Sequence, residues 1–227
     1  MGFKKRWLFV MLAGILALSL LQGCAGEKAT PAPTEPPGPT PTPEIPPQVA
    51  PIPVEEVSLE EAGEVLGAPV PMPAYLPSGY ELRRIFVREG RPHVYLLFSD
   101  EEITGKVQTL QDLYPLISKL EQPGASSGPK LCLIIEKPSS MPPLDFAEQM
   151  AKQAEGWGST VVDMSEVKGC LPANTVSVVE INQVKGYLST GETSYALAWF
   201  WSGFHFDMRM TKELPVEELI KIAESIG

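Results

Sequence analysis

Histidine, cysteine and the short motifs of catalysis are scarce in this sequence. Its 227 residues include two histidines and three cysteines. Several signatures are missing: the phosphate-binding loop G-x-x-x-x-G-K-[ST], the zinc-protease pattern H-E-x-x-H and the redox pair C-x-x-C. His205 and Asp207 share one face of a predicted strand, but a metal site needs a third ligand, which the sequence does not identify. We therefore predict no catalytic residue, no metal site and no cofactor, and hence a protein that is not an enzyme.

Basic residues are the second shortage. The chain has 18 Lys and Arg residues against 28 Asp and Glu residues. Residues 1–23 hold three of the basic ones and none of the acidic ones, so the remainder carries 15 minus 28, or −13. This charge argues against a nucleic-acid partner and against electrostatic attraction to anionic lipid. Attachment to a membrane must then come from acyl chains.

The sequence also lacks an apolar run long enough to cross a membrane. Its longest run, residues 7–21, falls short of the roughly 20 residues that a transmembrane helix needs. Lys4, Lys5 and Arg6 precede the run, and the small residue Gly23 follows it. This order is typical of a secretory signal peptide, which we place at residues 1–23, rather than of a retained transmembrane helix.

A cysteine follows this signal directly. Leu21-Gln22-Gly23-Cys24 resembles the lipobox of bacterial lipoproteins. The resemblance implies cleavage before Cys24, diacylglycerol on its thiol and acylation of the new amino terminus. Each buried CH₂ contributes about 0.8 kcal/mol, so several acyl chains hold firmly where one is marginal. We expect a protein anchored by lipid to the extracytoplasmic face of the cell membrane.

Residues 24–57 read as a tether. Residues 27–54 hold eleven of the chain's 24 prolines and show no apolar periodicity. Proline-rich segments favour the polyproline II conformation at about 3.1 Å per residue, so some 30 residues reach roughly 90 Å. We expect a disordered spacer, with a ligand for a proline-recognition domain as the alternative.

Residues 58–227 are long enough for one domain with its own core. We predict an α+β fold: an antiparallel β-sheet with helices packed mainly on one face. A capping box, Ser58 with Glu61, begins the first helix and Gly67 ends it. Further helices are expected at residues 107–120, where Pro115 should kink or split the helix, at 144–155 and at 215–226. Strands are expected at residues 80–88, 93–99, 131–136, 160–167 and 175–188.

Residues 195–210 give the clearest pattern, a β-hairpin that turns at Ser202-Gly203. One face would carry eight large apolar residues, and the other looks half solvated. We expect the last helix to cover most of the apolar face. We hypothesise that Trp201 and Phe204, beside the turn, stay partly exposed and mark the edge of a partner-binding site. The alternative is that they merely close the end of the core.

Three segments of the folded part resemble a known family. Leu76-Pro77-Ser78-Gly79-Tyr80, the strand ending Leu197-Ala198-Trp199, and the last helix from Leu214 are similar to the signatures of the domain of unknown function 4367. The resemblance spans Ser58 to the end, with residues 104–129 as an insertion. It implies an extracytoplasmic protein, because family members are often lipoproteins or parts of membrane regulators of the anti-sigma type. It supplies no catalytic residues.

Cys132 and Cys170 are the thiols left once Cys24 is acylated. In an oxidising compartment they could form a disulfide, and closing a loop of about 38 residues would contribute on the order of 3 to 4 kcal/mol. Cys132 lies in an apolar run, however, and a buried thiol is the alternative.

Two classes of function fit these features. The first is a binding or sensing module at the outer face of the membrane, for a small-molecule ligand, an envelope protein or cell-wall material. The second is a structural envelope lipoprotein that acts as a spacer without a specific ligand. A concave, partly exposed apolar surface would favour the first.

Overall fold

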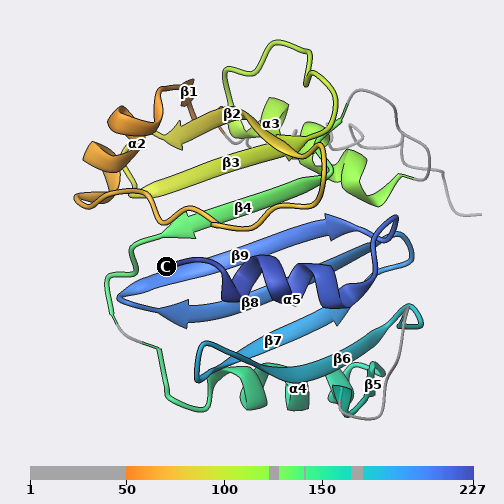
Figure 1. Cartoon of the computed structure of the whole chain (residues 1–227). Coiled ribbons are helices and arrows are strands. Elements are labelled where there is room, and N and C mark those ends of the chain that lie inside the picture. The colour runs from red at the N-terminus through yellow and green to blue at the C-terminus, as the bar shows by residue number, and fades with distance from the viewer. Residues whose placement is uncertain (1–49, 123–127, 141, 165–170) are drawn as a thin grey trace, which may run out of the picture. The chain divides into compact units, whose positions relative to one another are not determined.

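The computed structural model describes residues 50–122, 128–140, 142–164 and 171–227. The predicted signal peptide, Cys24, most of the proline-rich tether and Cys170 lie outside these residues. The described chain forms one nine-stranded sheet in the order β1-β2-β3-β4-β9-β8-β7-β6-β5 (Figure 1). Its strands are β1 Val54–Glu56, β2 Glu81–Arg88, β3 His93–Ser99, β4 Leu131–Glu136, β5 Thr160–Val161, β6 Thr175–Ile181, β7 Val184–Thr190, β8 Ser194–Trp201 and β9 Phe204–Thr211.

Neighbouring strands run antiparallel except β5 and β6, which are parallel. The expected α+β class and antiparallel sheet are therefore confirmed. Strands β4 and β9 pair over six residues in the middle of the sheet. This pairing joins a first half, β1 to β4, to a second half, β5 to β9.

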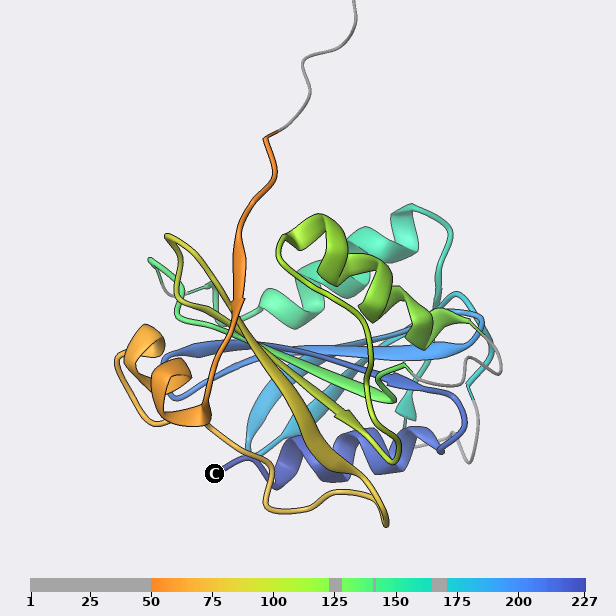
Figure 2. The ribbon, with the colours of Figure 1, turned by 90° about the horizontal axis from the view of Figure 1, so that it is seen from above.

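Helices cover both faces of the sheet. They are α2 Leu59–Leu66, α3 Leu110–Ile117, α4 Phe146–Gly156 and α5 Val216–Glu224, and a 3₁₀ helix, η1 Ser118–Glu121, follows α3. Figure 2 shows α3 and α4 on one side of the sheet and α5 on the other. The prediction of helices mainly on one face is thus wrong. The reason is visible in β3, whose residues from Val94 to Ser99 are all buried, so that both faces of the strand need a cover.

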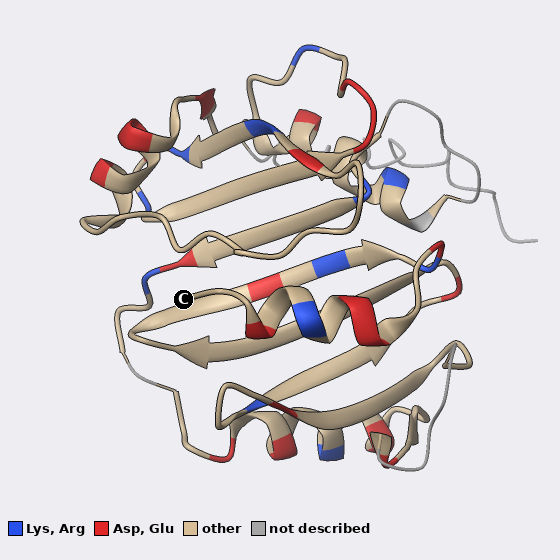
Figure 3. Cartoon of the chain, in the orientation of Figure 1, with Lys and Arg blue, Asp and Glu red and all other residues tan. Residues whose placement is uncertain are grey.

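Two apolar clusters result, one on each face. The larger lies under α2 and α5 and contains the buried stripe of α5: Val216, Leu219, Ile222 and Ala223. The smaller lies under α3 and contains Phe86, Tyr95, Leu97 and Cys132. In Figure 3 most charged positions lie on helices, loops and strand ends. The expected packing of the last helix on the sheet is confirmed.

Local signals set several boundaries correctly. The Ser58 hydroxyl accepts a hydrogen bond from the Glu61 amide at 3.3 Å, and the Glu61 carboxylate accepts one from the Ser58 amide at 2.7 Å. Gly67 ends α2 in the left-handed region, with φ of 67°. Helix α3 continues through Pro115 and ends at Ile117, where η1 takes over.

Some boundaries differ from expectation. The fold begins before Ser58, because Val54–Glu56 pairs with β2 and the Val54 side chain is buried under α3. Residues 175–188 form a hairpin rather than one strand, because Asn182 and Gln183 adopt positive φ values of 47° and 69° and reverse the chain. Within the residues described, no helix is both long and apolar enough to span a membrane.

Candidate partner-binding site at the end of the β8–β9 hairpin

The β8–β9 hairpin has the predicted register. Trp201 pairs with Phe204, Trp199 with Phe206 and Leu197 with Met208. Ser202 and Gly203 form the turn with φ values of 51° and 84°, a conformation that glycine adopts readily. Ala196, Ala198 and Phe200 of β8, and His205, Asp207 and Arg209 of β9, are half-buried, as expected for the second face.

The two predicted site residues differ in exposure. Trp201 is half-buried at the edge of the larger cluster. Phe204 is only 9% exposed, because its ring lies edge-on to that of Phe206 with centroids 6.3 Å apart. The expectation of partial exposure is therefore wrong for Phe204, which closes the end of the core. Trp201 alone remains available as an anchor.

A hollow of about 440 Å³ lies beside Trp201. The chain between β4 and α4 runs past the end of the hairpin and supplies one wall (Figure 1). We call this hollow the hairpin groove; its lining residues are Pro142, Pro143, Leu144, Phe146, Gln183, Val184, Lys185, Phe200, Trp201 and Ser202. The side chain of Leu144 is fully exposed at its edge. The lining is thus mainly apolar, with a few polar groups, as in many binding pockets.

Two rings form the inner wall of the groove, and a third ring packs behind them. Phe146, the first residue of α4, lies edge-on to Phe200 of β8 at 5.0 Å between centroids. His205 of β9 stacks on Phe200, with 4.5 Å between the ring centroids and 26° between the ring planes. The imidazole is therefore packed directly behind an aromatic residue of the groove.

His205 also belongs to a polar row that crosses three strands. His93 of β3, Glu136 of β4 and His205 of β9 are direct neighbours in register. Oε1 of Glu136 lies 2.6 Å from Nε2 of His93, and its Oε2 lies 3.9 Å from Nδ1 of His205. Burial lowers the pKa of His205, although the carboxylates of Asp207 and Glu136 oppose this effect. The row brings together both histidines of the chain.

An ion pair lies at the rim of the groove. The ammonium of Lys185 on β7 donates to the Glu148 carboxylate on α4. This bond raises the pKa of Lys185 and lowers that of Glu148. Both groups face solvent, so the pair stabilises little, and its role is to place α4 beside β7 at the rim.

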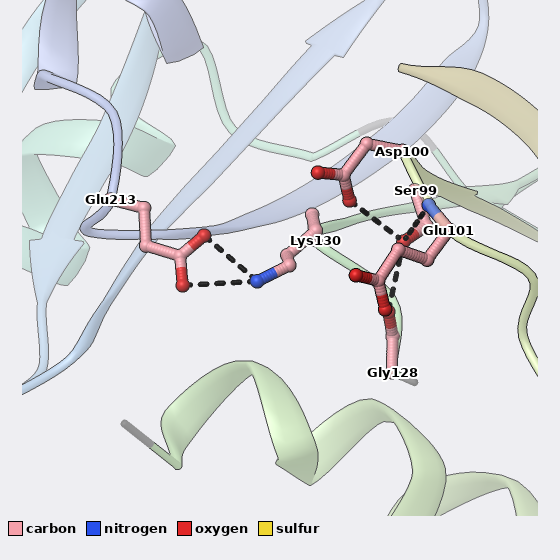
Figure 4. A network of polar contacts seen from close by, with 6 residues as sticks. All are labelled: Ser99, Asp100, Glu101, Gly128, Lys130 and Glu213. Carbon is pink, nitrogen blue, oxygen red and sulfur yellow. Dashed lines mark hydrogen bonds and ion pairs between the residues drawn. The ribbon is translucent and has the colours of Figure 1, made fainter. Parts of the chain in front are cut away.

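A second polar network lies near the opposite ends of the central strands (Figure 4). The Ser99 hydroxyl donates to the Gly128 carbonyl at 3.0 Å and accepts from the Glu101 amide at 3.3 Å. Lys130 donates to both carboxylate oxygens of Glu213, at 3.0 and 2.8 Å. These groups satisfy one another and tie loops to strand ends.

The thiol of Cys132 is buried in the smaller cluster and has no disulfide partner among the described residues. Burial raises its pKa, which disfavours the reactive thiolate. Leu171 packs in the larger cluster, on the opposite face of the sheet. Cys170 lies outside the described residues, so the bridge between Cys132 and Cys170 stays a prediction.

Sequence reasoning missed much of the groove. Residues 144–155 were expected to form one helix, but α4 begins at Phe146 and buries Ala147, Ala151 and Ala154, which leaves Leu144 outside the helix and exposed. The signal that could have found it is Pro142-Pro143-Leu144, since two prolines cannot sit inside a helix. Glu136, the neighbour of both histidines, carried no local signal.

Among the residues described, no group of three or more His, Cys, Asp and Glu side chains is arranged to hold a metal ion. No curated protein and no solved structure matches the chain significantly. The comparison with family models gives a match that starts well after Ser58, where the resemblance was expected to begin, and that leaves out Leu76 to Tyr80. Residues 144–226, which run from Leu144 through α5, match the family model of the domain of unknown function 4367.

Proposed function

We propose that this chain is a bacterial lipoprotein, anchored through Cys24 to the extracytoplasmic face of the cell membrane, whose folded domain is a non-catalytic binding module. The domain binds an apolar segment of an envelope protein in the hairpin groove. The signal peptide and lipobox support the location, and the net negative charge supports a partner other than nucleic acid.

One observation carries the binding role: fully exposed Leu144 stands beside half-buried Trp201 at the edge of an apolar hollow. A single exposed leucine is ordinary on a protein surface. Here it is grouped with Pro142, Pro143 and Phe146 around a volume of about 440 Å³. Such grouped apolar exposure is typical of interaction sites.

The lining indicates what the groove accepts. Prolines and aromatic rings offer flat apolar contacts, while Gln183 and Ser202 offer hydrogen bonds to a peptide backbone. A short extended segment rich in apolar or aromatic side chains satisfies both. A highly charged ligand does not, because Lys185 at the rim is already paired with Glu148.

The test is chemical crosslinking of the lipidated protein in its own membranes, followed by affinity capture. Leu144→Ala removes an exposed side chain and should leave the melting temperature unchanged. It should reduce capture of the partner roughly tenfold, an effect of about 1.4 kcal/mol. Trp201→Ala should reduce capture as well, with some loss of stability, because Trp201 also packs against the core.

Matched controls lie on other surfaces. Leu59 is 42% exposed on α2 and Trp157 is 77% exposed after α4, and neither lines the groove. Leu59→Ala and Trp157→Ala should therefore capture the partner normally. Equal capture by all four variants would reject the groove and favour the spacer role.

A Cys24→Ser precursor separates the location from the binding role. It should stay unprocessed and take up no labelled palmitate. Normal cleavage of an unlabelled wild-type chain would rule out the lipoprotein.

A further inference from the structure

His205 contacts the inner wall of the hairpin groove, and Glu136 lies between His205 and the other histidine, His93. Phe200 and Phe146 line the groove, and His205 stacks on Phe200 at 4.5 Å and approaches Phe146 edge-on at 6.3 Å. His205 in turn lies in one row with Glu136 and His93. A change in the position of the imidazole therefore reaches the groove through two ring contacts.

We propose that His205 makes the groove pH-dependent. A neutral His205 holds Phe200 and Phe146 in place as the groove's wall, and protonation draws the imidazole toward Glu136 and releases them. This inference rests on the proposed function for its biological meaning, because it concerns the regulation of the same site.

The distances give the direction of the movement. Nδ1 of His205 lies 3.9 Å from Oε2 of Glu136, which is too long for a hydrogen bond. An imidazolium gains a charge-assisted hydrogen bond by closing that gap, and such bonds are stronger than those between neutral groups. The ring is stacked on Phe200, so closing the gap to Glu136 shifts the imidazole relative to Phe200.

The charges that face His205 come from several elements. Asp207, on β9 itself, and Glu136, on β4, favour the protonated form, whereas His93, on β3, opposes it. Arg209, further along β9, lies 3.4 Å from Asp207 and offsets part of its charge. From α4 and β8 the neighbours are the uncharged rings Phe146 and Phe200.

Burial among these rings is the largest influence on His205 and lowers its pKa. The change should therefore occur below the ordinary histidine value of about 6.5. At neutral pH the groove is formed and binds its partner. In mildly acidic surroundings the wall loosens and the partner leaves.

The experiment is a pH titration of the full chain in detergent micelles, monitored by NMR of labelled histidine and phenylalanine rings. The ring signals of Phe200 and Phe146 should shift with the same midpoint as those of His205. In His205→Gln this shift should vanish, and in the matched control His93→Gln it should persist with a changed midpoint. Phenylalanine signals that ignore pH, or that titrate equally in His205→Gln, would overturn the proposal.

A second arm separates this inference from the proposed function. Crosslinked capture from membranes is repeated at about pH 7.5 and about pH 5.5, on either side of the histidine range. Wild-type capture should fall several-fold at the lower pH, and capture by His205→Gln should stay constant. If the rings titrate as expected but Leu144→Ala captures the partner normally, the coupling stands and the binding role of the groove fails. Capture by the wild type that does not change with pH would reject the regulation.

Discussion

Gly186 shows how tightly single positions are fixed beneath the hairpin. It lies in β7 opposite Trp199, on the buried face of the sheet. A Cβ atom at this position would lie 3.1 Å from Cδ1 of Leu197 and 3.4 Å from Cβ of Trp199. The position therefore needs glycine for lack of space rather than for backbone conformation.

We predict that Gly186→Ala destabilises the domain by about 1 to 3 kcal/mol, the usual cost of overpacking a core. Urea unfolding monitored by tryptophan fluorescence measures the change. Gly156→Ala is the matched control, because no atom lies within 4 Å of the added Cβ and the residue ends α4. Equal stability of the two variants would show that the core adapts to the extra methyl group.

We predict that the thiol of Cys132 is protected from thiol reagents while the domain is folded. It is buried between β4 and α3 and its pKa is raised. In a Cys170→Ser variant with Cys24 acylated, a thiol reagent should label Cys132 only after denaturant is added. Rapid labelling of the folded variant would show that α3 opens readily.

The same reagent decides the predicted disulfide in the wild type. In denaturant without reductant, an absence of free thiols would establish a bridge between Cys132 and Cys170. Two free thiols per chain would exclude it.

At the scale of elements, α5 holds the larger cluster together. Four of its nine residues are buried, and it lies over β8, β9 and β6. Tyr75 ties the helix to the segment before β2, since its hydroxyl donates to the Glu218 carboxylate at 2.5 Å. The last helix thus packs on the second half of the sheet and is tied by Tyr75 to the segment before β2.

Leu219→Ala should accordingly cost about 2 to 5 kcal/mol, the range for a leucine removed from a packed core. The melting temperature measured by circular dichroism reports the loss. Glu224→Ala, at an exposed position of the same helix, should change stability by less than about 0.5 kcal/mol. A small effect of Leu219→Ala would mean that α5 is peripheral to stability.

At the scale of the whole molecule, the family match and the folded unit have different lengths. The match covers residues 144–226, whereas residues 49–227 form one compact unit. The match begins after β4 in the sequence, but β4 pairs with β9 over six residues. The start of the match therefore separates two strands that are neighbours in the sheet. The matched segment alone would expose the edge of β9.

We predict that residues 144–227 expressed alone fold less stably than residues 50–227, with a lower melting temperature and a tendency to aggregate. The physical reason is the unpaired edge of β9 together with the lost contacts of Leu133 and Ile135 in the larger cluster. A fragment that melts cooperatively at the temperature of the longer chain would show that the second half is a domain of its own.

The sequence alone determined the local features of this fold. Ser202-Gly203 and the alternation around it specify the hairpin register, because a two-residue turn leaves one way to pair the strands. Ser58 and Glu61 specify the start of α2, and the spacing of Val216, Leu219 and Ala223 specifies the buried side of α5. Each of these signals acts within a few residues.

Only the tertiary structure decided which side chains from distant segments become neighbours on the sheet. No local pattern indicates that β4 lies between β3 and β9, which is what places Glu136 between His93 and His205. The same holds for Phe146, which reaches Phe200 because α4 packs on the second face of the sheet. These contacts arise from burying both faces of one continuous sheet, a requirement of the whole chain that short-range spacing does not encode.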